Sequence, residues 1–292
     1  MPESKRRYIA LAKRKDKVIQ SAVDAFVGDL RGHLKAVDSR MGQLVRSLET
    51  KSGAFVTTRF NLTRALNVRN QISEELVKRG LEDDVMKLMS SYDDAAVLAL
   101  EGLTITGRAA AFAEADIDAL AALKELDFRH WAGFGRDLAD DVTQKVVGAV
   151  VSGGKVEELA RSLEDTLRGM DDEDPRIVAK AETLANTYMH AFDRTVSARS
   201  AKIADIDTFI YVGPDDDVTR PFCDAVLHGE GGGEFGIPKA EIDGEELYYT
   251  SEDIGGMDNG QGLPVQQFGG GYNCRHGWYA YVPVEEEAEV AA

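Results

Sequence analysis

Four residues near the C-terminus have the types and the spacing of metal ligands. Cys223 and His228 are separated by four residues, and Cys274 and His276 by one. Two thiolates and two imidazoles are a sufficient ligand set for tetrahedral zinc. In an extended segment, residues i and i+2 point to the same side, so Cys274 and His276 can face one ion. The pattern indicates a structural zinc site that would stabilise a glycine-rich segment with a small core.

Other interpretations of the two cysteines, the only ones in the chain, stay open. They could form a disulfide, both could be buried free thiols, or one could be a catalytic thiol beside a histidine. The chain has no apolar run of membrane-spanning length and no signal-peptide pattern at its N-terminus. We therefore expect a reducing cytoplasm, which disfavours the disulfide.

Charged residues accompany both cysteines. Asp215, Asp216 and Asp217 follow a Gly-Pro pair, a pattern typical of a solvated turn more than of a cation site. Arg275 lies between Cys274 and His276 in the sequence. We expect its guanidinium to pair with one of the three aspartates, because such pairs are geometrically well matched.

Two longer motifs contain these residues, and together they resemble a known family. Asp-Asp-Asp-Val-Thr-Arg-Pro-Phe-Cys, residues 215–223, follows an aromatic segment, and Gly-Gly-Gly-Tyr-Asn-Cys-Arg-His occupies residues 269–276. In this order they resemble the C-terminal domain of phage head-morphogenesis or minor head proteins, the Mu F-like family. The resemblance covers residues 181–283.

The resemblance implies a minor structural protein of a tailed bacteriophage. Such a protein would lie in the virion head, after passing through the host cytoplasm during assembly. Its expected partners are the portal protein and the major capsid or scaffolding protein, within an oligomeric assembly. Its expected role is in head assembly and in DNA packaging or delivery.

The resemblance also carries expectations about individual residues. Asp217, Thr219 and Arg220 match the acidic turn of the family and would build a hydrogen-bond network. The family pattern implies a metal-binding or structural role for the cysteines. This chain departs from that pattern at Ala225 and Val226, where relatives carry a second early cysteine. His228 would have to take its place.

Periodic apolar residues predict that residues 1–205 are mostly helical. In the first helix, expected at 5–49, apolar steps of three and four residues form a seam from Ile19 to Leu48. We expect this seam to pack along other helices or to serve a larger assembly. Further helices are expected at 61–79, 81–103, 108–126, 134–151, 155–168 and 175–204.

The pattern changes after residue 204. β-branched and aromatic residues predict strands at 208–212, 246–250 and 278–282. The expected fold class is mainly α with a small α+β C-terminal domain, comprising a long N-terminal helix, a helical body and a loop-rich end that contains the Cys and His residues. The expected segments are a basic N-terminal helix at 1–52, a helical body at 53–205, a head-morphogenesis-like domain at 206–284 and an acidic disordered tail at 285–292.

Charge is unevenly distributed along the chain. The net charge is −17, yet residues 1–51 hold twelve Lys or Arg and six Asp or Glu. An acidic body favours protein partners over DNA. The basic N-terminal segment is either a solvated helix face or a contact for DNA phosphates. No membrane partner is expected.

No catalytic motif of nucleotide-binding, serine-hydrolase or zinc-protease type is present in the sequence, and we do not expect an enzyme. The alternative is a zinc-dependent hydrolase or nuclease that uses His276 or Asp217 beside the metal. A third hypothesis is a helical adaptor with a zinc-bearing end. Four protein ligands would make the site structural, whereas three ligands and a water would leave catalysis open.

Overall fold

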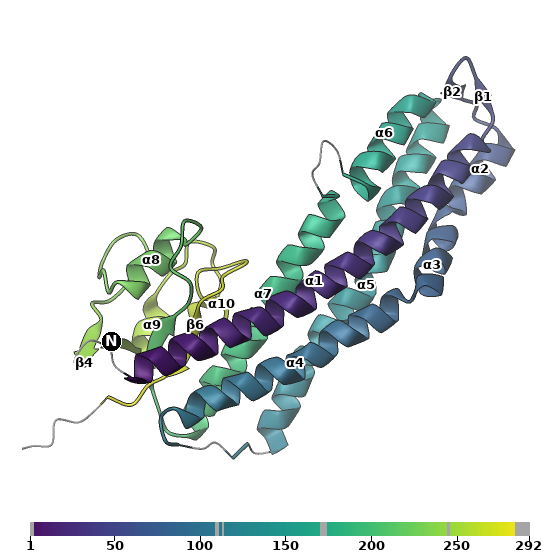
Figure 1. Ribbon diagram of the computed structural model, residues 1–292. Coiled ribbons are helices and arrows are strands. Elements are labelled where there is room, and N and C mark those ends of the chain that lie inside the picture. The colour runs from purple at the N-terminus through teal and green to yellow at the C-terminus, as the bar shows by residue number, and fades with distance from the viewer. Residues whose placement is uncertain (1–2, 109–110, 113, 170–173, 244–245, 284–292) are drawn as a thin grey trace, which may run out of the picture. The chain divides into compact units, whose positions relative to one another are not determined.

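The computed structural model describes residues 3–108, 111–112, 114–169, 174–243 and 246–283 (Figure 1). The acidic tail expected at 285–292 lies outside them. Helices dominate the described residues and a small antiparallel sheet follows near the C-terminus, so the predicted fold class is confirmed. The helices are α1 (Glu3–Arg46), α2 (Arg59–Leu66), α3 (Val68–Arg79), α4 (Leu81–Thr104), α5 (Glu114–Ser152), α6 (Val156–Leu167), α7 (Arg176–Ile203), α8 (Pro221–Leu227), α9 (Ser251–Gly256) and α10 (Val265–Phe268). The strands are β1 (Thr50–Lys51), β2 (Ala54–Phe55), β3 (Thr208–Val212), β4 (Glu241–Asp243), β5 (Glu246–Thr250) and β6 (Gly277–Ala280).

The apolar seam of α1 is buried inside the chain. Val23, Val37 and Met41 have no exposed side-chain surface, and Ile19 and Leu34 are 1% exposed. Side chains three and four residues apart lie on one face of a helix, so this face packs in the core along its length. The long helix is confirmed. The idea that its seam serves a larger assembly is wrong, because the chain itself covers the seam.

None of the described helices has the length and apolarity needed to cross a bilayer.

Contacts divide the chain into two compact units, which cut across the four segments expected from the sequence. Unit 1 comprises the described residues of 1–21, 90–124 and 184–292. Unit 2 comprises 22–89 and 125–183. The first part of α1 therefore belongs to the same unit as the C-terminal sheet.

Unit 2 is a helical bundle in which two predictions about helix ends are corrected. One helix was expected at 61–79, but Asn67 separates α2 from α3. The end of α3 is as predicted, since Gly80 adopts a left-handed conformation with φ 85°. Two helices were expected within 108–151, but α5 runs without a break from Glu114 to Ser152. Its Gly135 lets other helices approach, because an added Cβ would lie 3.0 Å from a Leu81 methyl carbon.

Unit 1 contains a four-stranded antiparallel sheet in the order β4-β5-β3-β6. The strand predicted at 208–212 is β3, which pairs with β6 from Phe209–Ala280 to Val212–Gly277. Helices α8, α9 and α10 gather around this sheet in Figure 1. One core of the unit joins aromatic residues of β3, β5 and β6 to apolar residues of the surrounding helices.

The N-terminal part of α1 packs on the same sheet. Tyr8 and Leu11 share a second hydrophobic cluster with Ile210 and Tyr279. The Tyr8 hydroxyl donates to the Ala280 carbonyl at 2.6 Å. Because this helix start completes the core of unit 1, we expect the unit to need residues from both ends of the chain.

Burial of the α1 seam predicts the effect of truncating one side chain. Leu34→Ala should lower the free energy of unfolding by about 2–5 kcal/mol, because it leaves a cavity in a close-packed core. Lys35→Ala, at the exposed neighbouring position, should change the same quantity by about 0.5 kcal/mol or less. Urea denaturation followed by circular dichroism measures both. Equal, small effects would contradict the burial of the seam.

Candidate metal centre

Three of the four predicted ligands meet at one buried point in unit 1. Cys223 lies in α8, Cys274 follows the turn after α10, and His276 immediately precedes β6. The two Sγ atoms are 3.7 Å apart, and Nδ1 of His276 is 3.8 Å from Sγ of Cys274. All three residues are buried, and their donor atoms lie within 4.8 Å of one another. This group could hold a metal ion.

His228 is not part of this group, which corrects the predicted ligand set. It follows Cys223 by five residues, at the end of α8. Five steps along a helix turn a side chain by about 140° from the starting direction. Cys223 therefore points inward while His228 is half exposed, 3.5 Å from a carboxylate oxygen of Asp215 and 3.4 Å from one of Asp224.

Helix α8 is placed by the residues at its start. Pro221 occupies the first helical turn, where its fixed φ suits the helix and its missing N–H is not needed. Arg220, the N-cap residue, donates through Nη1 to the carbonyl of Gly270 at 2.7 Å. This bond ties the Cys223 segment to the glycine-rich turn that precedes Cys274. The network of Arg220 with Asp217 and Thr219 that the resemblance implied stays a prediction.

Glycines leave the space that the donor atoms occupy. A Cβ added at Gly270 would lie 2.3 Å from Sγ of Cys223. One added at Gly269 would lie 2.9 Å from Sγ of Cys274. One added at Gly213 would lie 2.3 Å from the His276 ring. Since real side chains do not approach so closely, all three glycines are required by the packing around this site.

The environment of Cys274 favours its thiolate. Its sulfur accepts from the backbone N–H of Gly270 at 3.2 Å and lies within hydrogen-bonding distance of Sγ of Cys223. The hydrogen bond from Cys223, followed by the nearby charge of Arg194 and by His276, holds the pKa of Cys274 well below its usual value against the opposing effect of burial. The hydrogen bond to Cys274, then burial, raises the pKa of Cys223. A lowered pKa favours the thiolate, which is the form of cysteine that binds metals.

Arg194 of α7 holds the turn that contains two of the donors. It is 2% exposed. Its Nε donates to the carbonyl of His276 at 2.7 Å, its Nη1 to that of Gln267 at 3.2 Å, and its Nη2 to that of Cys274. Sequence reasoning missed this residue, because nothing in a helical run distinguishes an inward arginine from an exposed one.

Tyr211 of β3 was also missed as a site residue. Its ring stacks on His276 with centroids 5.2 Å apart and an interplanar angle of 15°. Its other neighbour is Trp278, at 4.4 Å between centroids. Burial, then the charges of Cys274 and Cys223, raises its pKa well above the usual value. The sequence placed Tyr211 on a strand, but both faces of β3 are buried, so alternation did not show where its side chain points.

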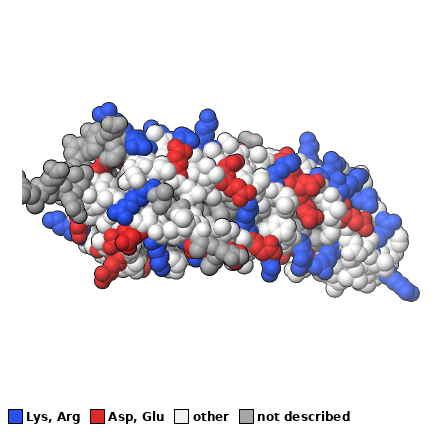
Figure 2. All heavy atoms as spheres, turned by 90° about the horizontal axis from the view of Figure 1, so that it is seen from below, with Lys and Arg blue, Asp and Glu red and all other residues white. Residues whose placement is uncertain are grey.

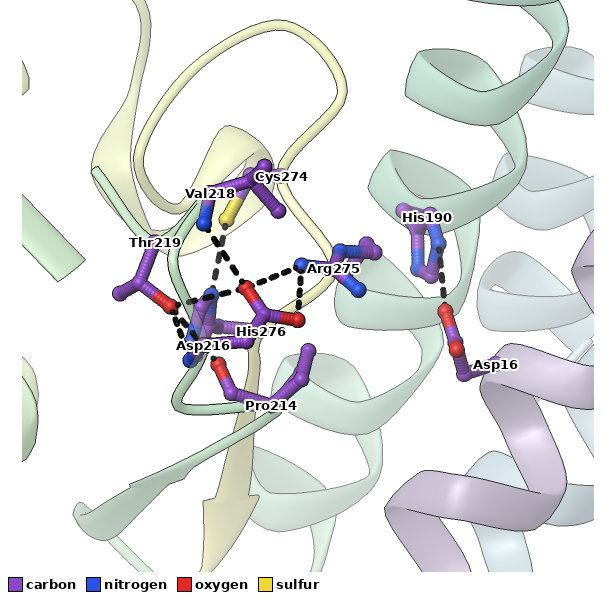
Figure 3. Close-up of polar contacts among 9 residues, drawn as sticks. All are labelled: Asp16, His190, Pro214, Asp216, Val218, Thr219, Cys274, Arg275 and His276. Carbon is purple, nitrogen blue, oxygen red and sulfur yellow. Dashed lines mark hydrogen bonds and ion pairs between the residues drawn. The ribbon is translucent and has the colours of Figure 1, made fainter.

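The polar network beside the site is centred on Asp216 (Figure 3). Arg275 Nη2 donates to both of its carboxylate oxygens, at 2.8 and 2.7 Å. Thr219 accepts from the Asp216 backbone N–H at 2.9 Å, and the Val218 N–H donates to Oδ1 of Asp216 at 3.3 Å. The hydrogen bond from Arg275 lowers the pKa of Asp216. The expected pairing of Arg275 with an aspartate is confirmed. The sequence predicted that Asp217 belongs to this hydrogen-bond network. In the structure the carboxylate that binds Arg275 is that of Asp216, and Asp217 is exposed.

More buried charge lies close to Arg194. Lys15 and Asp193 form an ion pair at 2.6 Å, with 4% of each side chain exposed. His190 is buried 3.8 Å from Asp16 (Figure 3). Burial, then the charge of Arg194, lowers the pKa of His190 to about 3. His190 is therefore neutral at physiological pH.

A small cavity of about 20 Å³ borders the donor atoms. Cys223, Cys274 and His276 line it together with Thr219, Arg220 and Arg275, among others. Such a volume is about that of one water molecule or ion. Nε2 of His276 is buried and has no hydrogen-bond partner among the described residues. The site has room for one ion and no room for a substrate.

Comparisons with models of protein families, with curated proteins and with solved structures found no match for this chain.

The role of Arg194 predicts a large stability effect. Arg194→Lys should lower the free energy of unfolding by about 2–4 kcal/mol, because a single ammonium cannot reach three buried carbonyls in a fixed fork. Arg275→Lys is the matched control. Its partly exposed pair with Asp216 should contribute about 0–1 kcal/mol. Denaturation with guanidinium chloride measures both variants, and similar losses would contradict the assigned role of Arg194.

Proposed function

We propose that Cys223, Cys274 and His276 hold a structural zinc ion. The observation that carries this proposal is the spacing of the donors. Zinc lies about 2.3 Å from sulfur in a tetrahedral site, which puts two sulfur ligands roughly 3.8 Å apart. The Sγ atoms are 3.7 Å apart, whereas a disulfide would bring them to about 2.05 Å.

Burial and thiolate character support the same proposal. Paired free thiols in an apolar core need no stabilised thiolate. Here Cys274 accepts a backbone N–H, lies beside a guanidinium, and adjoins a cavity of ionic size. A zinc ion would join α8 to the turn before β6 and would stabilise a unit rich in loops.

We further propose that the chain is a minor structural protein of a tailed-bacteriophage head. What supports this is that the two motifs behind the family resemblance pack against each other around one centre. Arg220 of the first motif binds Gly270 of the second, and Arg275 of the second binds Asp216 of the first. Residues that resemble the family thus serve one local structure, which is what a shared domain would require.

Partners in the head would be the portal protein and the capsid or scaffolding protein. The buried seam of α1 cannot provide that contact, so exposed surfaces must. On the face in Figure 2, basic and acidic side chains are interspersed. Such a mixture suits protein contacts better than a continuous DNA-binding surface. Contact of the basic N-terminal segment with DNA remains a prediction.

The hydrolase or nuclease alternative is less well supported. It requires an open metal position and a substrate next to it. The donor atoms are buried, and the adjoining cavity of about 20 Å³ admits nothing larger than a water or an ion.

Metal analysis of the purified protein tests the zinc proposal. We expect about one zinc ion per chain by elemental analysis, retained on dialysis, and its loss in Cys274→Ser. His228→Ala is the matched control and should keep the zinc held by the cysteines, because His228 lies with the exposed Asp215 and Asp224, outside the group of Cys223, Cys274 and His276. Metal-free wild-type protein would contradict the proposal, and so would a His228→Ala variant that loses zinc while Cys274→Ser retains it.

Composition of phage particles tests the proposed location. In cells that express this chain and produce tailed particles, mass spectrometry of purified heads should detect the chain in fewer copies than the major capsid protein. A tagged chain recovered only from the particle-free fraction would count against the proposal. This outcome does not depend on whether zinc is bound.

A further inference from the structure

A fourth potential donor atom lies against the two sulfurs. The hydroxyl oxygen of Tyr211 is 3.4 Å from Sγ of Cys223 and 3.5 Å from Sγ of Cys274. Tyr211 lies on β3, opposite Trp278 of β6, so the sheet itself fixes its position. Strand β3, helix α8 and the segment before β6 thus bring a phenol oxygen to the same point as the thiols.

These distances fit the edges of a zinc tetrahedron. With zinc about 2.3 Å from sulfur and about 2.1 Å from oxygen, the sulfur–oxygen edge is roughly 3.6 Å. The two measured edges are 3.4 and 3.5 Å. The sulfur–nitrogen edge to His276 is 3.8 Å, against roughly 3.6 Å for an ideal site. Each of these donor–donor distances is therefore close to the corresponding edge of a tetrahedral zinc site.

We propose that the phenol oxygen of Tyr211 is the fourth ligand of the metal ion, which closes the site and makes the ion purely structural. This inference rests on the proposed zinc ion, and adds the ligand that replaces both His228 and a bound water. On coordination the phenolic proton is released to solvent, and the oxygen binds as phenolate.

The partners of other buried tyrosines in unit 1 support this assignment. A buried tyrosine hydroxyl usually donates to an oxygen acceptor. Tyr8 donates to the Ala280 carbonyl at 2.6 Å, and Tyr249 to the Val226 carbonyl at 3.0 Å. Among the described residues, the hydroxyl of Tyr211 has only the two cysteine sulfurs within hydrogen-bonding distance. It is directed at the metal donors and not at a carbonyl.

Gly269 lies close to the Tyr211 oxygen as well as to the Cys274 sulfur. A Cβ added at Gly269 would lie 3.0 Å from the Tyr211 oxygen, close to the Sγ of Cys274. The absence of a side chain at Gly269 therefore lets the backbone pass close to both the phenol oxygen and the thiol.

Charge balance also favours a fourth anionic ligand. Zinc with two thiolates and one neutral imidazole is neutral, which leaves the adjacent Arg194 as an extra buried positive charge. A phenolate gives the centre a charge of −1, and Arg194 neutralises it. Buried charges are costly unless they are paired. The neighbouring Lys15–Asp193 pair is already balanced, so it does not supply the missing negative charge.

The test compares the zinc-loaded wild-type protein with Tyr211→Phe and Tyr249→Phe. Each variant removes one buried hydroxyl, but only Tyr211 adjoins the sulfurs. Competition with a chromophoric chelator should show zinc affinity at least about 10-fold weaker in Tyr211→Phe, and unchanged in Tyr249→Phe. Ultraviolet difference spectra should show a tyrosinate band that disappears when zinc is removed from wild type or from Tyr249→Phe.

The outcomes separate this inference from the zinc proposal. If wild-type protein binds no zinc, the zinc proposal itself fails, and the tyrosine ligand with it. If wild type binds zinc without a tyrosinate band, the fourth position holds water and this inference alone is overturned. The same conclusion follows if Tyr211→Phe keeps wild-type affinity or if both variants lose affinity equally. The wild-type spectrum decides the matter even if Tyr211→Phe does not fold.

Discussion

The structure of unit 1 depends on bringing two sulfur atoms, from cysteines 51 residues apart, to within 3.7 Å of each other in a buried place. A thiol pair does not converge by its own attraction to any useful extent. The surrounding elements must position the pair. Helix α8 carries one cysteine, the turn before β6 carries the other, and Tyr211 of β3 contacts both sulfur atoms. The loop-rich connection between them then has a fixed start and a fixed end.

Arg194 provides much of that positioning. Its guanidinium donates to three backbone carbonyls, one in α10 and two in the segment before β6. Removing one partner from such a network lowers the free energy of unfolding by more than the net contribution of the lost hydrogen bonds. The reason is that the remaining polar groups stay buried without a partner. The positive charge also favours the thiolate form of Cys274. One side chain from α7 therefore links the helical part of unit 1 to the chemistry of its C-terminal turn.

Local features were predictable from the sequence, and distant ones were not. The seam of α1, the left-handed stop at Gly80 and the strand at 208–212 each follow from periodicity or from one residue's conformational freedom. The approach of Cys274 and His276 also followed from alternation in an extended segment. His228 was assigned wrongly because α8 was not foreseen, and a helix turns that side chain away from Cys223. Arg194 and Tyr211 could not be assigned to the site, since only the tertiary fold brings them there.

The central claim is that one zinc ion lies between Cys223, Cys274 and His276 and holds their segments together. Crystals of the purified protein, measured at energies above and below the zinc absorption edge, test it most directly. The account predicts one anomalous peak per chain, about 2.3 Å from both sulfur atoms and about 2.0 Å from Nδ1 of His276. Two sulfur atoms bonded at about 2.05 Å, or free thiols with no peak between them, would contradict it.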